Sequence, residues 1–468
     1  MKSGNAGGGK GPQFRVNARR GKGQGTGVSL QAPQSVQKLQ TALHAKAKDG
    51  PEFRFYALYD KVYRADVLDH AWRLTKANGG AAGVDGQSFS DIHDYGVERW
   101  LGELAKDLRK KTYRPRAVRR VYIPKPDGRK RPLGIPTIRD RVAQMAAVLV
   151  LAPIFEADLE PEQYAYRPGR SAHDAVRHVH RLLNTGRQDV VDADLSGYFD
   201  NIPHSELLTS LARRISDRHM LHLIKQWLVA PVEEEDGRGG RRQTATARHN
   251  KRGIPQGAPI SPLLSNVYMR RFVLGWKTLG HAARLDAHVI NYADDFVILC
   301  RGTADQAMVA MREMMTRLKL TVNEDKTHLC RVPDSSFDFL GYTFGRCYSR
   351  KKGRAYIGTR PSRKSIAKVC RAMGEMTSRR WLLKAPHDRV ERLNWLLTGW
   401  ANYFCLGSVS KAYRSVDAHA RSRLRTWLRK KHKLPDRGTA RFPDTYLENS
   451  LGLKKLKLLT RDLPWAKA

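Results

Sequence analysis

Long hydrophobic runs, paired cysteines and acidic residues are scarce in this chain of 468 residues. No run of about 18 consecutive apolar residues occurs, and the N-terminus lacks the apolar segment of a secretory signal, so we expect no membrane-spanning helix and no membrane partner. The five cysteines are widely spaced and form no Cys-x-x-Cys pair, which argues against a zinc ribbon or a disulfide framework. This cysteine usage favours a reducing compartment, and we expect the bacterial cytoplasm, with an organelle as the alternative.

The shortage of acidic residues leaves a strong positive charge. Lys and Arg number 85 against 45 Asp and Glu, so the formal net charge is +40 at pH 7. A field of this sign attracts a polyanion, either nucleic acid or an anionic membrane surface. Because the sequence has no lipidation motif and no obvious basic amphipathic anchor, nucleic acid is the favoured partner. A basic structural protein of the ribosomal type fits the composition as well.

Composition divides the chain into five parts. Residues 1–34 hold nine glycines, six Lys or Arg and no acid, which predicts a disordered basic tail, with an organellar transit peptide as the rival interpretation. Helical patterns dominate residues 35–115, an N-terminal helical extension, and strand and helix patterns follow each other through residues 116–345. A basic helical domain is expected at 346–437, and residues 438–468 are expected to form a C-terminal tail.

The basic helical domain carries half of the net charge. Between Arg346 and Arg437, 25 Lys or Arg stand against 5 acids. Apolar residues recur there at steps of three and four from Val390 to Phe404, and residues 413–433 resemble this segment, so two amphipathic helices are predicted. Interleaved aromatic rings either contact a nucleic-acid strand or form the core of these helices, with only the basic side chains touching RNA. The rings belong to Trp381, Trp395, Trp400, Tyr403 and Trp427.

Two adjacent aspartates stand between two apolar runs in HVINYADDFVILC, residues 288–300. The pattern predicts two strands with Ala293 to Asp295 at the tip. Placing Asp294 and Asp295 at the end of a buried sheet is unfavourable unless a cation or hydrogen bonds compensate the charge. About 100 residues earlier, VVDAD ends a second strand at Asp194. Three such carboxylates suit Mg²⁺, and two ions about 4 Å apart can activate a 3′-hydroxyl and stabilise a leaving pyrophosphate. An ordinary surface turn is the alternative.

Further residues suit the binding of a nucleotide. Lys125 and Arg131 flank a predicted hairpin in PKPDGRKRPLG and could hold a triphosphate, although an exposed basic turn would look the same. Gln256, in the glycine- and proline-containing loop GIPQGAPISP, could hydrogen-bond a sugar or base. Phe199, five residues after Asp194, could lie under the ribose and exclude a 2′-hydroxyl; the alternative is a core aromatic residue.

The order of these motifs is similar to that of the group II intron-encoded reverse transcriptases, also called maturases. The resemblance covers roughly residues 55–435 and rests on a series of segments that extends beyond the candidate residues named above. These segments are AAGVDG, IPKPDGRKRPLGIP, QYAYRPGRSAHDAV, DADLSGYFDNI, KLTVNEDKTHL, FDFLGYTF and LNWLLTGWANYF.

The resemblance implies an α+β right hand of fingers, palm and thumb, with an antiparallel palm sheet and a basic helical thumb or maturase domain. It gives Asp194, Asp294 and Asp295 the catalytic and metal-binding role, with two Mg²⁺ ions and Mn²⁺ as a substitute. Ala193 and Leu195 would contribute backbone beside the metals. The nucleotide-binding role falls to Lys125, Arg131, Phe199 and Gln256. Implied partners are group II intron RNA, an RNA template with a DNA primer, deoxynucleoside triphosphates and target DNA; the oligomeric state stays open.

One departure from the family pattern concerns the C-terminal part. Many relatives continue into a DNA-binding segment and a cysteine-rich HNH endonuclease, whereas here the last cysteine is Cys405 and the sequence ends about 30 residues past the basic helices. We therefore expect no cutting of target DNA by this chain, as in the endonuclease-lacking lineages such as group IIC.

Three functions fit the sequence. The first is an intron-encoded reverse transcriptase that promotes splicing and retromobility by target-primed reverse transcription. The second is a free-standing host reverse transcriptase in DNA repair or phage defence. The third is a non-enzymatic RNA chaperone with a decayed polymerase centre, against which the presence of all three aspartates argues.

Overall fold

The computed structural model describes residues 30–124, 130–235, 241–244, 249–349, 353–436 and 438–460. The N-terminal part is helical, as expected for residues 35–115. Its helices are α1 (Gln34–Asp49), α2 (Tyr59–Val62), α3 (Ala65–Asn78), α4 (Phe89–Tyr95) and α5 (Val97–Lys110). Most of the basic tail expected at 1–34 lies outside the described residues, and α1 already begins at Gln34.

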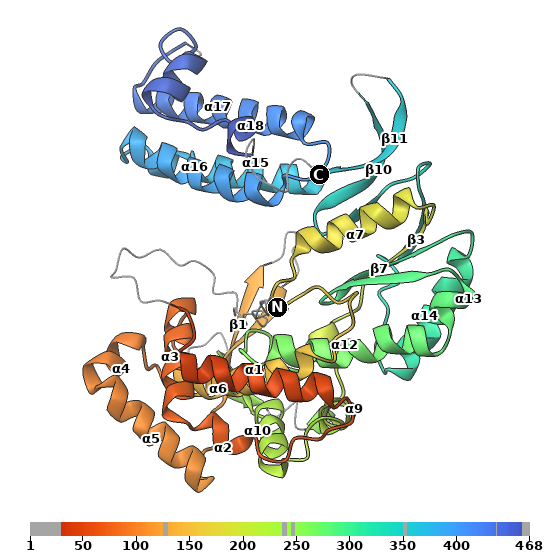
Figure 1. Ribbon diagram of the computed structural model, residues 1–468. Coiled ribbons are helices and arrows are strands. Elements are labelled where there is room, and N and C mark those ends of the chain that lie inside the picture. Colours follow the sequence, from red (N-terminus) through yellow and green to blue (C-terminus); the bar gives the residue numbers. More distant parts are fainter. Residues whose placement is uncertain are drawn as a thin grey trace, which may run out of the picture.

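Helix α6 (Ile138–Glu156) is the central support of this part. Thr137 caps its N-terminus, where its hydroxyl accepts a hydrogen bond from the backbone N–H of Asp140 at 3.1 Å. Nearly every side chain of α6 is buried, as expected for a helix that is apolar around its whole circumference. It packs against α1, α3 and α12 (Ser261–Thr278), so it joins the N-terminal helices to the rest of the fold (Figure 1).

A first sheet forms the expected hairpin around PKPDG. Strands β1 (Val118–Pro124) and β2 (Lys130–Ile135) are antiparallel, and β1 pairs in parallel with β4 (Val232–Glu235), which continues to β5 (Arg241–Thr244). The hairpin is exposed along much of β1, which suits a finger that reaches over a substrate. Lys125, between the two strands, lies outside the described residues.

A second sheet is the antiparallel palm sheet that the resemblance implies. Its order is β6-β7-β3-β8. The strands are β3 (Asp189–Ala193), β6 (His288–Tyr292), β7 (Asp295–Cys300) and β8 (His328–Arg331). Five of the six residues of β7 are buried, because both faces of the sheet are covered. The apolar run FVILC is therefore explained by burial on both sides.

The two faces of the palm sheet belong to two hydrophobic cores. Val191, Phe296 and Ile298 pack in the core that contains α12 and α14 (Ala304–Arg317). Alternate residues such as Val190, Val297 and Leu299 point the other way. That second face meets α7 (Ala172–Asn184) and the C-terminal part of the chain (Figure 1). Shorter helices complete this region: α8 (Tyr198–Asn201), α9 (His204–Ala212), α10 (Arg218–Leu228) and α13 (His281–Arg284).

The C-terminal part combines a small sheet with helices. Strands β9 (Phe337–Phe339), β10 (Tyr342–Tyr348) and β11 (Ala355–Pro361) pair in the order β11-β10-β9. The helical elements are α15 (Arg363–Met376), η1 (Arg379–Trp381), α16 (Pro386–Tyr403), α17 (Ser410–Lys431), η2 (Tyr446–Ser450) and α18 (Leu456–Leu459). Helices α16 and α17 are the two predicted amphipathic helices, and their apolar faces are buried.

Two expectations on domain limits need correction. The expected boundary at 345/346 falls inside β10, since the small sheet links the palm to the helices. Residues 438–460 are folded and do not form a tail: Leu447, Leu453 and Leu456 are buried against α16 and α17, because the two long helices alone leave apolar surface to cover. Across the described residues, no helix is both long enough and apolar enough to cross a membrane.

Candidate active site

The palm sheet brings the three predicted catalytic aspartates to one edge. Strands β3 and β7 pair in antiparallel register, and the last pair is Ala193 with Phe296. Extending that register by one residue sets Asp194 opposite Asp295, which corresponds to about 4.5–5.5 Å between their Cα atoms. Asp294 is the neighbouring residue in the β6–β7 turn. Residues 100 positions apart in the sequence thus meet through backbone pairing.

The turn that carries Asp294 is tight and strained. Tyr292 pairs with Asp295, so only Ala293 and Asp294 form the loop, and Ala293 has a φ of 61°. A positive φ at the first loop residue matches the twist of a two-residue hairpin but is unfavourable for a residue with a Cβ. The buried side chain of Asn291 supports the turn, since its Nδ2 donates to the carbonyl oxygen of Ala293 at 2.9 Å. The turn is therefore held in place by the strand before it.

Like charges surround Asp295. Burial and then the charges of Asp294, Asp194 and Asp192 raise the pKa of the Asp295 carboxyl to about 7. The side chain is nevertheless exposed by area. The carboxyl group therefore has much protein around it, while part of the side chain still contacts water. Burial likewise raises the pKa of Asp192, two residues before Asp194 on the same face of β3, to about 6.

Asp194 is already partly neutralised. Its Oδ2 accepts hydrogen bonds from the Lys326 ammonium at 2.8 Å and from Asn323 Nδ2 at 2.9 Å. Within the described part of the chain, no three Asp, Glu, His or Cys side chains are already arranged as a metal site. The donor set still fits a divalent cation, because oxygen ligands with a surplus of negative charge are what Mg²⁺ prefers. Of the charged groups that act most strongly on the pKa of Asp295, only Lys326 lowers it.

Two of the residues predicted to hold the nucleotide, Phe199 and Gln256, lie on segments that contact each other. The backbone N–H of Ile254 donates to the Phe199 carbonyl at 2.8 Å, and Gln256 Nε2 donates to Asp200 Oδ2 at 3.1 Å. The loop of Gln256 is therefore attached to α8, which follows Asp194. Phe199 is partly buried against the core around α12, so part of its ring is a core surface, and its contact with a nucleotide stays a prediction.

The same loop also contacts the finger hairpin. The N–H of Gly134 in β2 donates to the Gln256 carbonyl at 2.7 Å. Gly257 has a φ of 107°, and a Cβ there would meet the Gly134 carbonyl oxygen at 2.7 Å, so only glycine permits this close approach. The exposed Arg131 lies three residues before Gly134 on β2. The loop of Gln256 thus joins β2 at Gly134 to α8 at Phe199, and Arg131 stands on the same strand as Gly134.

The two residues that flank Asp194 are buried. Ala193 and Leu195 are 3% and 4% exposed, and Leu195 forms a bridge with Val322. Their side chains face the core, so any contribution to the site comes from their backbone groups, and that role stays a prediction.

Sequence reasoning missed four residues at this edge. Asp192 is detectable from its spacing, because it stands two residues before Asp194 and a strand repeats every second residue. Asn323 and Lys326 lie in NEDKTHL, which was quoted only for resemblance. Tyr166 comes from a distant loop, yet the charges of Asp294 and Arg131 both act on its hydroxyl. No local pattern could have shown this proximity.

Comparison with known proteins supports the same conclusion. Residues 123–344 match the family described as reverse transcriptase (RNA-dependent DNA polymerase), and residues 366–442 match the group II intron maturase-specific domain. Protein YkfC of Escherichia coli (strain K12) is 33% identical over 368 residues, which cover 70% of this chain and 93% of that relative. Group II intron-encoded protein LtrA of Lactococcus lactis subsp. cremoris is 34% identical over 229 residues, 48% of this chain and 36% of that protein.

A third relative is the putative COX1/OXI3 intron 1 protein of Saccharomyces cerevisiae, 26% identical over 294 residues, 52% of this chain and 34% of the relative. The chain thus spans about a third of the length of these two longer relatives. Fold, palm aspartates and family match together define an RNA-directed DNA polymerase of the right-hand class, which as a family uses divalent metal ions. The chain belongs to the group II intron-encoded reverse transcriptases and maturases.

Proposed function

We propose that this chain extends a DNA primer on an RNA template, with Asp194, Asp294 and Asp295 as ligands of two Mg²⁺ ions. The observation that carries the proposal is the strand register that sets Asp194 opposite Asp295, with Asp294 beside them. Burial and neighbouring carboxylates raise the pKa of Asp295 to about 7. A cation bound at this edge would stabilise the ionised carboxylates. When bound, the ions would lower the pKa of the primer hydroxyl and neutralise charge on the phosphates.

The protein groups divide the remaining tasks. Arg131 on the finger hairpin holds the triphosphate, and Lys125, outside the described residues, is expected to do the same. Gln256 contacts the sugar or base, and the Phe199 ring blocks space for a 2′-hydroxyl. Ala193 and Leu195 offer backbone groups beside the aspartates. The hydrogen bonds of the Gln256 loop to β2 and α8 support a shared nucleotide site.

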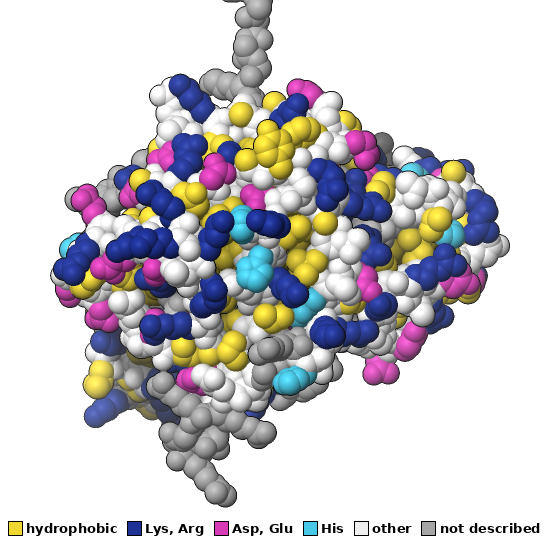
Figure 2. All heavy atoms as spheres, turned by 90° about the horizontal axis from the view of Figure 1, so that it is seen from below, with side chains coloured by type: hydrophobic (Ala, Val, Ile, Leu, Met, Phe, Trp, Pro, Cys, Tyr) yellow, Lys and Arg dark blue, Asp and Glu magenta, His cyan; other side chains and the backbone are white. Residues whose placement is uncertain are grey.

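We further propose that the positive surface binds group II intron RNA in addition to the template. Exposed Lys and Arg are spread over the face in Figure 2, which lies on the opposite side from the C-terminal helices in Figure 1. Lys111, Arg114, His219 and His222 are among the residues that line a recess. Binding through phosphates weakens with salt, so affinity should fall steeply between low and moderate salt. A flat salt response would contradict this role.

Promotion of splicing and retromobility follow from this second proposal, as does a location in the cytoplasm. A free-standing host enzyme is the alternative. A domain V-type RNA hairpin encoded downstream of the gene favours the intron role, and its absence favours the host role. That the protein does not cut target DNA itself stays a prediction.

The test is primer extension by pure protein on an RNA template with Mg²⁺ and deoxynucleotides. Asp294→Ala should lower the rate by about 1,000-fold or more, since several kcal/mol of charge stabilisation depend on the metal site. RNA binding should stay within about twofold. Asp305→Ala is the matched control, because that carboxylate is 74% exposed on α14. Extension by Asp294→Ala at the wild-type rate, or joint loss of RNA binding and folding, contradicts the proposal.

A further inference from the structure

Tyr166 holds a backbone conformation that its side chain disfavours. Its φ is 58°, in the left-handed region where a bulky residue is a genuine outlier. Strain of this kind persists only where the surrounding structure enforces it, and it concentrates at functional sites. The residue lies in QYAYRPGRS, a segment that the proposed function does not otherwise use.

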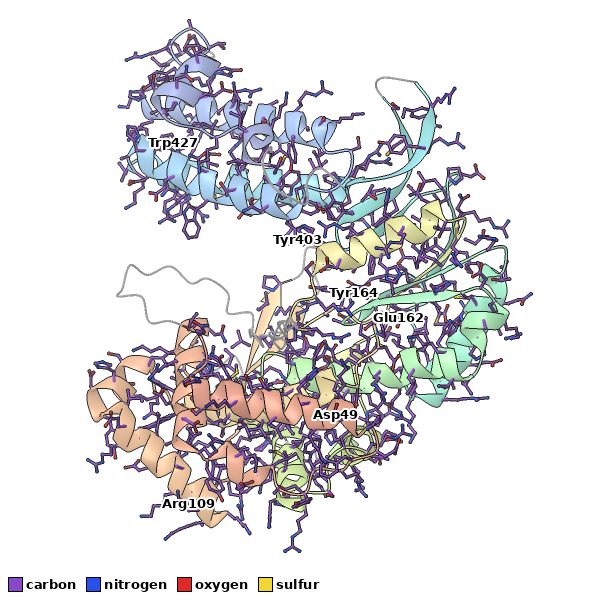
Figure 3. The ribbon with its side chains drawn as sticks, in the orientation of Figure 1. Asp49, Arg109, Glu162, Tyr164, Tyr403 and Trp427 are labelled. Atoms are coloured by element: carbon purple, nitrogen blue, oxygen red, sulfur yellow. The ribbon has the colours of Figure 1, made fainter. Side chains whose placement is uncertain are left out.

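The backbone on both sides of Tyr166 is fixed by buried contacts. The Tyr164 N–H donates to the Asn291 carbonyl at 3.0 Å, and Asn266 Nδ2 donates to the Ala165 carbonyl at 2.7 Å. On the other side, the guanidinium of Arg167 pairs with Glu156 at 2.7 Å, with only 5% of the Arg167 side chain exposed. The loop is thereby attached to β6, three residues before Asp294. Figure 3 shows Tyr164 and Glu162 of this segment beside the palm sheet.

Packing does not account for the strain. The ring of Tyr166 is 53% exposed and belongs to neither hydrophobic core of the described residues. Surrounding protein, and then the charge of Asp294, raise the pKa of its hydroxyl. The hydrogen bond of Tyr164 to Asn291 sets this loop beside the strand that leads to Asp294, and the charges of Tyr292, Arg131 and Asp295 also act on the Tyr166 hydroxyl.

We propose that Tyr166 is a positioning residue whose ring contacts the nascent base pair, formed by the incoming nucleotide and its template base. This inference rests on the proposed polymerase function. The space between metal-binding carboxylates and the arginine that holds the triphosphate is where the new nucleotide must lie. An aromatic ring can contact any base or sugar without sequence preference. Because the loop is already fixed, little conformational entropy is lost when the ring makes this contact.

Three variants of the full chain test the proposal. Tyr166→Ala and Tyr166→Gly should each lower kcat/KM for deoxynucleotide incorporation by about 10-fold or more, the range expected when one aromatic ring no longer stacks on a base. Tyr166→Phe should retain activity, since the ring remains. Affinity for the template–primer duplex should stay within about twofold in all three.

Thermal unfolding separates this role from a structural one. Glycine relieves the left-handed strain, so Tyr166→Gly should unfold at the same temperature as Tyr166→Ala or above it. Tyr56→Ala, at an aromatic residue that is 75% exposed on the N-terminal part, is the matched control and should keep full activity.

The outcomes are distinguishable. A wild-type chain that extends no primer overturns the proposed function itself. An active wild type with equally active Ala and Gly variants overturns only the inference on Tyr166. Loss of activity in Tyr166→Phe also overturns the inference, because the effect would then belong to the hydroxyl. A parallel loss of affinity for the template–primer duplex overturns it too, because the ring would then contact the bound primer end.

Discussion

The edge of the palm sheet and the C-terminal helices use charge in opposite ways. At the palm edge, burial and the charges of Asp294, Asp194 and Asp192 raise the pKa of the Asp295 carboxyl, so like charges oppose its ionisation. The surrounding turns are strained, as the φ of Ala293 shows. The C-terminal helices instead carry surplus positive charge on their outer surface, over a regular apolar core. The palm edge requires particular side chains at fixed positions, whereas the C-terminal helices require mainly a positively charged surface.

Tyr403 is one of the residues that connect the C-terminal helices to the rest of the molecule. Tyr403 ends α16, and its carbonyl accepts a hydrogen bond from the hydroxyl of Tyr342 in β10 and lies 2.6 Å from the Nε2 atom of His173 in α7. Burial and the neighbouring Tyr292 and Asp295 raise the pKa of its hydroxyl to about 12. The C-terminal helices therefore contact α7 and β10 through Tyr403, which Figure 3 labels at the end of α16.

The largest expected effect concerns the stability of the C-terminal helices. Leu397 is fully buried in α16, so Leu397→Ala should destabilise the C-terminal helices by about 2–5 kcal/mol. Leu383→Ala, at a side chain that is 97% exposed, should change stability by less than about 0.5 kcal/mol. Chemical unfolding monitored by tryptophan fluorescence measures both. Equal effects would mean that α16 does not pack as described.

A second substitution concerns the palm. Phe199→Ala should reduce the preference for deoxynucleotides over ribonucleotides by about 10- to 100-fold, because the space for a 2′-hydroxyl opens. Phe199→Tyr preserves the bulk and should preserve the preference. Competition between the two nucleotide types in primer extension gives the ratio. An unchanged ratio would leave Phe199 as a core residue only.

Charge substitutions should act differently in the helical region. Lys368, Arg371, Lys411 and Arg414 are exposed on α15 and α17, and their joint replacement by Gln should weaken RNA binding. For every phosphate that the protein no longer neutralises, the slope of log affinity against log salt should decrease by about 0.7–0.9. Lys368→Arg with Lys411→Arg keeps the charge and should keep the slope. If this conservative pair weakens binding as much as Gln does, the region needs particular atoms after all.

The smallest expected effect is the gain in stability that the substitution Asp295→Asn should produce at high pH. The pKa of Asp295 is about 7 in the folded chain and about 3.8 ordinarily, so between these pH values the folded state binds more protons. Stability should therefore fall as pH rises from about 4 to 7. Asp295→Asn should remove this loss, so that it unfolds later than wild type at pH 8 in chelator and equally near pH 4.

Solvent exposure of Asp295 keeps the gain modest. Added Mg²⁺ should stabilise the wild type more than the variant. Asp305→Asn is the control and should show neither effect. A variant less stable than wild type at pH 8 would mean that the carboxylates at the palm edge do not repel one another.

Local patterns predicted much of this molecule. Alternation and apolar runs marked the strands before Asp194 and around Asp294, and three- and four-residue steps marked α16 and α17. The buried Trp400 and Trp427 confirm that these rings form the core, whereas Trp395 is 58% exposed. Residues 438–460 were misjudged, because short apolar segments without periodicity give no sign of the surface they will cover.

The sequence alone determined which residues can hold a cation, where the strands and long helices run, and that the surface is strongly positive, since these depend on residue type and spacing. Only the tertiary structure decided that Asp194 and Asp295 lie at the same end of one strand pair, that Lys326 reaches Asp194, and that the loop of Tyr166 is attached to the strand before Asp294. The physical reason is that these contacts depend on strand register and on loops joined over a hundred residues, which no local preference specifies.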